Sequence, residues 1–161
     1  MTTAVEPIPT DYPVITPYLH VDGAADAIDF YTQVLGATER MRIGAPGGKI
    51  GHAELVIGTS MIMLSDEFPE MDAAGPRTVG GTPVSIHVYV TDADAAHDRA
   101  VKAGAKSLRP VEKQFYGDRS GQFEDPFGHR WSVATHVEDV PAEELARRAA
   151  EVMGGAADDQ S

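Results

Sequence analysis

The 161-residue sequence contains no cysteine. This absence excludes disulfide-stapled folds, thiolate zinc sites, iron–sulfur clusters and cysteine nucleophiles. Positive charge is also scarce, because 13 Lys and Arg stand against 25 Asp and Glu, for a formal net charge of −12 at pH 7. Such a chain repels phosphate backbones, so no nucleic-acid partner is expected. The acidic balance would suit a cationic guest, although many proteins are acidic for solubility alone.

Long hydrophobic runs are absent as well. No window holds the roughly eighteen consecutive apolar residues that a membrane span requires, so no membrane partner is expected. The first thirteen residues have neither the basic nor the apolar region of a secretory signal, which favours a cytoplasmic protein. The apolar fraction of 42% is typical of a globular domain with its own core.

Both ends of the sequence differ from its middle. Residues 1–13 contain three prolines and show no periodicity, and residues 154–161 are small and acidic. Such segments are typical of flexible tails, so we expect a single domain over residues 14–153.

The first half of this domain begins with a period-two segment. One face carries Ile15, Pro17, Leu19 and Val21, and the other carries Thr16, Tyr18 and His20. This alternation predicts a strand with one packed face. A helical stripe and three further period-two segments follow, at 24–35, 38–43, 51–57 and 60–65. Gly58-Thr59 is the expected turn of the last pair.

The second half repeats this order. A strand at 84–90 precedes a helix at 93–103, and strands follow at 106–111, 119–124 and 129–136. We therefore predict an α+β fold of two βαβββ modules, 14–65 and 83–136, whose mixed sheets form a concave half-barrel cavity. A C-terminal helix is expected at 141–153, because acidic residues open it and basic residues follow.

Residues 66–82 connect the modules. The segment is rich in Gly, Pro and acidic residues and has no clear period. A connection of this length is usually a functional lid or a disordered linker, and both interpretations stay open.

Three groups of residues carry a family resemblance. They are Ala27-Ile28-Asp29-Phe30-Tyr31 with Leu35-Gly36-Ala37, Val90-Thr91-Asp92 with Ala103-Gly104-Ala105, and Glu124-Asp125-Pro126-Phe127-Gly128-His129. Together with the doubled βαβββ order, they resemble the vicinal oxygen chelate superfamily, specifically its small bacterial glyoxalase-like members. The superfamily includes glyoxalase I, extradiol dioxygenases, fosfomycin-resistance enzymes and bleomycin-resistance proteins. The resemblance covers about residues 14–136 and implies a homodimer.

In metal-using members of that superfamily, four His, Glu or Gln side chains on the concave faces hold the ion. Alignment through the helix motifs places these positions at Thr16, Met63, Ser85 and Ser132. Three hydroxyls and a thioether are unsuitable ligands for a divalent first-row metal. The resemblance therefore implies a cavity without the usual metal centre, and we predict no metal and no cofactor.

Further residues are expected to face this cavity, because residues two apart on a strand share a face. Glu54 is expected opposite Met63, since a turn at Gly58-Thr59 pairs them. The predicted ligand-binding residues are Thr16, Tyr18, His52, Glu54, Met61, Met63, Ser85, His87, Tyr89, Arg130 and Ser132. Burial beside methionines would raise the pKa of Glu54.

Some of these residues have plain structural interpretations. His20 ends a strand and is expected to be partly exposed or hydrogen-bonded within the fold. His52 and Glu54 could pair with each other or with Arg130 in a buried polar network. His129 is expected to be structural, because it follows a turn on the wrong face for the cavity.

Three functions remain open. The first is metal-free binding of a small organic molecule, for sequestration or resistance. The second is a metal-free acid–base enzyme, of isomerase, epimerase or lyase type, with His52, Glu54, His87 and Tyr18 as catalytic residues. The third is a metal enzyme with a displaced site of His52, Glu54 and His87. Metal analysis of purified protein tests the third, because less than about 0.1 equivalent of transition metal would exclude it.

Overall fold

The computed structural model describes residues 4–158. The chain forms two compact units, and each is described by itself. The first unit contains the chain up to Pro83 together with Pro126–His129, and the second contains Val84–Asp125 and the chain from Arg130 onward. The predicted outer parts of the tails, residues 1–3 and 159–161, lie outside the described residues.

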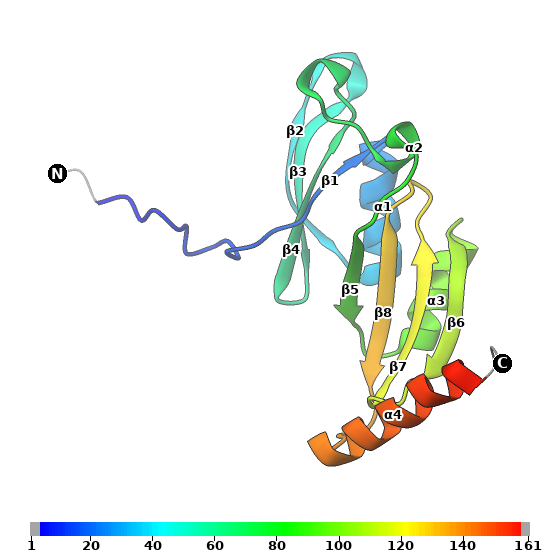
Figure 1. Cartoon of the computed structure of the whole chain (residues 1–161). Helices are drawn as coiled ribbons and strands as arrows, with labels where there is room; N and C mark the ends of the chain where they lie inside the picture. The colour runs from blue at the N-terminus through cyan, green and yellow to red at the C-terminus, as the bar shows by residue number, and fades with distance from the viewer. Residues whose placement is uncertain (1–3, 159–161) are drawn as a thin grey trace. The chain divides into compact units, whose positions relative to one another are not determined.

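The first unit is a four-stranded mixed sheet with one long helix (Figure 1). Its spatial order is β1-β4-β3-β2, in which β1 and β4 are parallel and the other pairs are antiparallel. Its regular elements are β1 (Tyr18–Val21), α1 (Ala24–Leu35), β2 (Thr38–Gly44), η1 (Pro46–Gly48), β3 (Ile50–Ile57) and β4 (Ser60–Asp66). The connecting segment adds the short helices η2 (Pro69–Met71) and α2 (Pro76–Val79).

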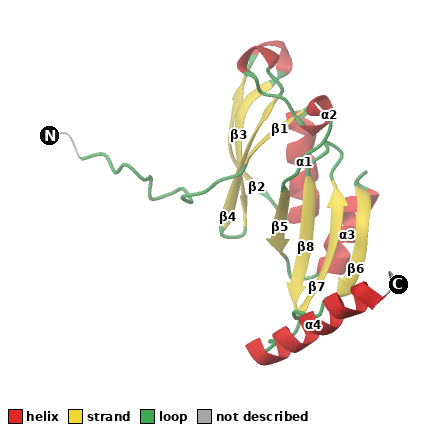
Figure 2. Ribbon diagram, in the orientation of Figure 1, coloured by secondary structure: helices red, strands yellow, loops and turns green. Residues whose placement is uncertain are grey.

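The second unit repeats this plan, with the order β5-β8-β7-β6 and a parallel β5–β8 pair. Its elements are β5 (Ser85–Tyr89), α3 (Ala93–Lys102), β6 (Lys106–Lys113), β7 (Asp118–Glu124), β8 (Arg130–His136) and α4 (Ala142–Asp158). Figure 2 shows the strands of each unit gathered in a sheet, with a helix beside it. The predicted α+β class and the βαβββ order are confirmed.

Each core lies between a sheet and its helix, because apolar side chains alternate on the strands and recur along the helix. In the first unit, Leu55 and Leu64 are fully buried, as are Tyr31 and Val34 of α1. Burying each such side chain contributes about 1.5–3 kcal/mol. Phe127, from the short turn between β7 and β8, belongs to this core and packs edge-on against the ring of Phe30.

The core of the second unit is made by residues of β7, β8 and α3. Phe123, Trp131 and Val133 are buried against small alanines of the helix. The indole N–H of Trp131 donates to the Asp125 carboxylate over 2.9 Å, so this buried polar atom has its partner. Because Trp131 and Val133 face the helix, Ser132 faces the opposite side of the sheet, as parity predicts.

The connecting segment 66–82 is folded against the first unit. Phe68 and Ala73 form a backbone bridge, and Gly75 lies so close to β1 that an added Cβ would come within 2.7 Å of the His20 carbonyl oxygen. The predicted roles of this segment, a lid or a linker, stay predictions.

Several predicted boundaries differ from the structure. The first strand begins at Tyr18, so Ile15, Thr16 and Pro17 precede it, and the sixth strand continues to Lys113.

Two further differences concern the predicted tails. The last helix continues to Asp158 rather than ending at residue 153, so residues 154–158 belong to a helix and not to a tail. Its two glycines cost only about 1 kcal/mol each, which the rest of a long helix can absorb. Tyr12, in the predicted N-terminal tail, donates a hydrogen bond to Glu54 over 2.8 Å. Within residues 4–158, no helix has the length and apolar character to span a bilayer.

Asp66 joins three elements of the first unit. Its carboxylate accepts from the backbone N–H groups of Gly23 and Ala24, at the start of α1, and of Ile50, at the start of β3. We expect Asp66→Ala to lower the free energy of unfolding by about 3 kcal/mol, because buried N–H groups lose their acceptor. Urea denaturation measures this loss.

A matched control is Asp29→Ala, which removes an exposed carboxylate from α1. It should change the free energy of unfolding by no more than about 0.5 kcal/mol. Equal effects of the two substitutions would contradict the role assigned to Asp66.

Candidate functional site

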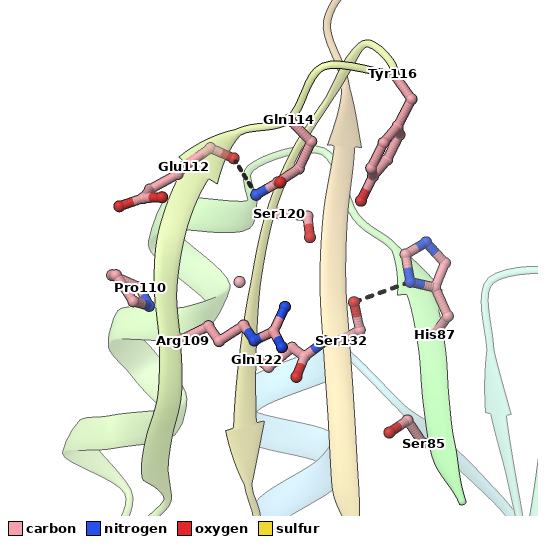
Figure 3. Close-up of a pocket in the computed structure, with 11 residues that line it drawn as sticks. Ser85, His87, Arg109, Pro110, Glu112, Gln114, Tyr116, Ser120, Gln122 and Ser132 are labelled. Carbon is pink, nitrogen blue, oxygen red and sulfur yellow. Dashed lines mark hydrogen bonds between the residues drawn. The ribbon is translucent and has the colours of Figure 1, made fainter. Parts of the chain in front are cut away.

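The sheet of the second unit is hollowed on the face opposite α3 (Figure 3). The hollow has a volume of about 460 Å³, within the range of about 300–1,000 Å³ usual for small-molecule sites. Its lining residues come from all four strands and the β6–β7 connection: Ser85, His87, Arg109, Pro110, Glu112, Gln114, Tyr116, Ser120, Gly121, Gln122 and Ser132.

Irregular pairing of β6 with β7 shapes this hollow. The register shifts on either side of Arg109, which bends the edge strand as β-bulges do. Gly121 permits the close approach, because an added Cβ there would come within 2.7 Å of Val111 Cγ2. A side chain at residue 121 would push the two strands apart and change the shape of the hollow.

Arg109 is the cation of the hollow. Within residues 4–158, its guanidinium has no ion pair or hydrogen bond, and Figure 3 shows it beside the Gln122 amide. Glu112, the lining carboxylate, extends away from Gln114, whose amide donates to the Glu112 carbonyl over 3.3 Å. Arginine stays charged in proteins, so its five N–H donors are available to an incoming acceptor.

His87 and Ser132 lie opposite each other on parallel strands, and their side chains meet. His87 Nδ1 and Ser132 Oγ are 2.9 Å apart. The hydrogen bond fixes the plane of the imidazole ring and leaves Nε2 as its second polar atom.

The carboxylate of Asp118, which lies outside the lining of the hollow, has two hydrogen-bond partners. Tyr89 Oη donates to Asp118 Oδ2 over 2.8 Å, and His136 Nδ1 lies 2.8 Å from Oδ1. Burial tends to raise the pKa of Asp118, but the hydrogen bonds from His136 and Tyr89 outweigh it and hold that pKa below its usual value. Hydrogen bonds with Asp139 and Asp118 raise the pKa of His136, and the bond with Asp118 raises that of Tyr89.

The first unit carries a second polar network on its sheet. Glu54 is only 3% exposed, and its carboxylate accepts from Tyr12 Oη over 2.8 Å and lies 2.9 Å from His52 Nε2. His52 Nδ1 in turn lies 2.8 Å from Tyr18 Oη. The guanidinium of Arg40, at 3.9 Å, is the nearest cation to Glu54.

The predicted rise in the pKa of Glu54 is wrong. Burial does favour the protonated form, but hydrogen bonds from His52 and Tyr12 and the charges of His52 and Arg40 outweigh burial and lower the pKa. Glu54 is therefore a carboxylate at neutral pH. The polar network predicted around it is present, with Arg40 in the place expected for Arg130.

The four positions that the resemblance assigns to a metal do not fit one. Thr16 precedes β1, Met63 lies on β4, Ser85 begins β5 and Ser132 lies on β8. Hydroxyls and a thioether leave the charge of a divalent ion uncompensated. Of the displaced set, His52 and Glu54 belong to the first unit and His87 to the second, and that alternative stays a prediction. In the described part of the chain, no group of three or more His, Asp or Glu side chains is placed to hold an ion.

The structure divides the other predicted site residues between the two sheets. Ser85, His87 and Ser132 line the hollow. Arg130 and Tyr89 are exposed and lie outside its lining, while His20 is half-buried and bonds to Ser65 Oγ over 3.0 Å. Tyr18, His52, Glu54, Met61 and Met63 lie on the sheet of the first unit. The predicted pairing of Glu54 with Met63 is confirmed.

The predicted ligand-binding residues leave out the other residues that line the hollow: Arg109, Pro110, Glu112, Gln114, Tyr116, Ser120, Gly121 and Gln122. Parity offered a signal for Ser120 and Gln122, since Gln122 pairs with Ser132. It offered none for Arg109 and Glu112, because the shifted register of β6 breaks the period.

Sequence comparison agrees with this architecture. The profile of the Glyoxalase/Bleomycin resistance protein/Dioxygenase superfamily matches residues 14–133, so the chain belongs to that superfamily. The uncharacterized protein Rv0887c of Mycobacterium tuberculosis is 45% identical over 136 residues, which cover 83% of this chain and 80% of that protein.

Two solved structures illustrate the fold. Protein PA1353 of Pseudomonas aeruginosa is 31% identical, with a TM-score of 0.60 over 77% of this chain and 98% of its own. The fosfomycin resistance protein FosX of Mesorhizobium loti is 18% identical, with a TM-score of 0.57 over 84% of this chain and 98% of its own. The second likeness concerns the fold alone.

His136 should make folding stability depend on pH. The pKa of His136 is higher in the folded protein than in the unfolded chain. The protonated ring therefore stabilises the fold fully at a pH below the pKa of the unfolded chain, and this stabilisation is lost as the pH rises through the pKa of the folded protein. We expect wild-type protein to be more stable than His136→Gln near pH 5.5, with the difference shrinking by about pH 9. Urea unfolding at both pH values measures it.

Asp139→Asn is the matched variant, because it removes one of the two carboxylates that His136 contacts. Compared with the wild type, Asp139→Asn should show a smaller loss of unfolding free energy between about pH 5.5 and about pH 9, because Asp118 still contacts His136. A difference of the same size at both pH values would contradict the assignment.

Proposed function

We propose that this protein binds a small organic molecule, without a metal ion, in the hollow of the second unit. The guanidinium of Arg109 in that hollow, which has no partner among the described residues 4–158, carries the proposal. A cation surrounded by amides and hydroxyls, without an ion pair of its own, is typical of a site whose acceptor arrives with a ligand.

The lining favours a ligand with an acidic group and a small apolar body. Arg109 can bind a carboxylate through two parallel hydrogen bonds, and the amides of Gln114 and Gln122 can serve further acceptors. Tyr116 and Pro110 provide apolar contact at the rim. The net charge of −12 belongs to the whole chain and does not decide the guest, because the charge next to the ligand dominates at short range.

The superfamily name includes bleomycin resistance, and FosX is named as a fosfomycin resistance protein. These names support a role in which this chain sequesters a small molecule or gives resistance to it. The proposed setting is the cytoplasm.

We further propose a homodimer. Apolar side chains that a partner copy would cover are exposed on β2, at Met41 and Ile43, and on α4, at Val152 and Met153. Every residue of β2 is exposed. A second copy covering such an edge strand would bury these side chains and pair unused backbone groups.

Aromatic probes of different charge test the binding site. Benzoate, benzamide and benzylamine share one ring and differ in charge. We expect benzoate to shift the backbone amide NMR signals of Arg109, Gln122 and Ser132, with a Kd on the order of 1 mM for so small a probe. Arg109→Gln should weaken benzoate at least about tenfold, because a charged hydrogen bond contributes about 1.5–3 kcal/mol.

Lys106→Gln is the control, since it removes one positive charge from the same strand outside the hollow. Lys106→Gln should change the Kd for benzoate by no more than about twofold, because exposed charges are screened by salt. Binding of benzylamine in preference to benzoate would contradict the acidic ligand. Absence of shifts around the hollow with all three probes would contradict the site.

A further inference from the structure

A histidine and a serine occupy equivalent places in the two units. In the first unit, His20 is paired with Ser65 across the parallel strands β1 and β4. In the second unit, His87 is paired with Ser132 across β5 and β8. The imidazole Nδ1 lies 3.0 Å from the serine Oγ in the first pair and 2.9 Å in the second. Each unit therefore holds a hydroxyl beside a base, which is the arrangement that can activate a serine nucleophile.

The position of the serine proton distinguishes the two pairs. Ser65 Oγ donates its proton to the carbonyl oxygen of Asp66 over 2.9 Å, so the hydrogen between Ser65 and His20 must come from the imidazole Nδ1. Ser132 is buried, and within residues 4–158 its hydroxyl bonds to His87 alone. Because a buried hydroxyl places its proton on an acceptor, Ser132 donates to His87 Nδ1. Of the two serines, Ser132 is the one that its histidine can deprotonate.

The second pair also borders the hollow, in a row of four side chains that crosses the sheet. Arg109 on β6 is paired with Gln122 on β7, and Gln122 is paired with Ser132 on β8, beside His87 on β5. All four residues line the hollow. The row therefore presents, in order, a cation, an amide, a hydroxyl and an imidazole.

The length of the row sets the size of the ligand that it can hold. Neighbouring strands lie about 4.7–4.9 Å apart. The Arg109 side chain already reaches the Gln122 amide, and Figure 3 shows Gln122 between Arg109 and Ser132. A ligand with one aromatic ring is therefore long enough to join the guanidinium to Ser132 Oγ.

We propose that Ser132 is a nucleophile, with His87 as its base, toward esters whose acyl part carries an ionised carboxylate. Arg109 binds that carboxylate, and the Gln122 amide donates to the carbonyl oxygen that gains negative charge during the attack. This activity rests on the proposed binding of an acidic ligand in the hollow, and it adds a reaction to that binding.

Bonds and protons balance through an acyl-serine intermediate. The Oγ–H bond of Ser132 breaks and its proton goes to His87 Nδ1, while a bond forms between Oγ and the acyl carbon. The bond from the acyl carbon to the alcohol oxygen breaks, and the imidazolium gives the proton to that oxygen. Water then gives a proton to His87, attacks the acyl carbon and releases Ser132, which takes the proton back. The net reaction converts an ester and water into an acid and an alcohol.

Mono(p-nitrophenyl) terephthalate tests this chemistry, because it carries an ionised carboxylate and an activated ester on one rigid ring. Absorbance follows the release of p-nitrophenolate, and peptide mass spectrometry locates the acyl group. Ser85 and Ser120 are internal references, since they line the same hollow and neither contacts a histidine within the described chain. We expect Ser132 to be acylated at least about tenfold faster than either reference. Acylation of all three serines at one rate would overturn the assignment.

Variants test the nucleophile and its base. Ser132→Ala should abolish the acylation, and His87→Gln should slow it at least about a hundredfold, because a positioned general base contributes that much. Ser132→Cys places a nucleophile at the same position in a chain without another cysteine, and it should be acylated there. An unchanged rate in His87→Gln would overturn the role of the base.

Ser65→Ala is the matched control, because it removes the serine of the equivalent pair in the first unit. It should change the acylation rate of Ser132 by no more than about twofold, since distant sites act independently. Thermal melting confirms that each variant is folded. Loss of acylation in folded Ser65→Ala would contradict the choice of Ser132.

A neutral ester tests the ligand class. The ester p-nitrophenyl benzoate has the same ring and leaving group and lacks the carboxylate. It should acylate Ser132 at least about tenfold more slowly than the terephthalate ester, and Arg109→Gln should remove this difference. Equal rates for the two esters in wild-type protein would overturn the requirement for an acidic group.

Benzoate binding separates this inference from the proposed function. Benzoate that competes with the acylation of Ser132 would support both. Benzoate binding without acylation would overturn the nucleophile and leave the binding function standing. Loss of both binding and acylation would overturn both.

Discussion

Parallel pairing of the first and last strands constrains both units. β1 pairs with β4, and β5 pairs with β8, each in parallel. A parallel pair cannot be closed by a hairpin, so the chain must cross the sheet, and in each unit a helix makes part of that crossing. The helix covers one face and sets where the apolar core lies. The opposite face is left to polar side chains, which the alternation of each strand places there.

Much of this architecture is encoded locally. The strand and helix periods predicted all eight strands of the two sheets, and the turn at Gly58 predicted the pairing of Glu54 with Met63. Gly36 ends α1 in the left-handed conformation, which glycine adopts without strain. These features depend on residues close together in the chain, where backbone preference and alternation decide the outcome.

The candidate sites depend on strand register and on contacts between residues that are far apart in the sequence. Arg109 follows an irregular register of β6 that no period reveals, and Gly121 matters because of what approaches it. The pKa of Glu54 is lowered by hydrogen bonds from His52 and from Tyr12, 42 residues away, and by the charges of His52 and Arg40. Sequence reasoning weighed burial beside methionines and had no sign of Tyr12 or Arg40. Burial alone favours the neutral acid, but hydrogen-bond donors that reach the carboxylate reverse the preference.

The turn Pro126–His129 joins two strands of the second unit, yet its packing belongs to the first. Phe127 lies against Phe30, and the ring N–H of His129 donates to the His20 carbonyl over 2.9 Å. A gene fragment ending at Pro83 would therefore encode a first half with an unfilled aromatic gap. The two units repeat one order of strands and helix, but the first unit would lose this packing if it were produced without residues 126–129.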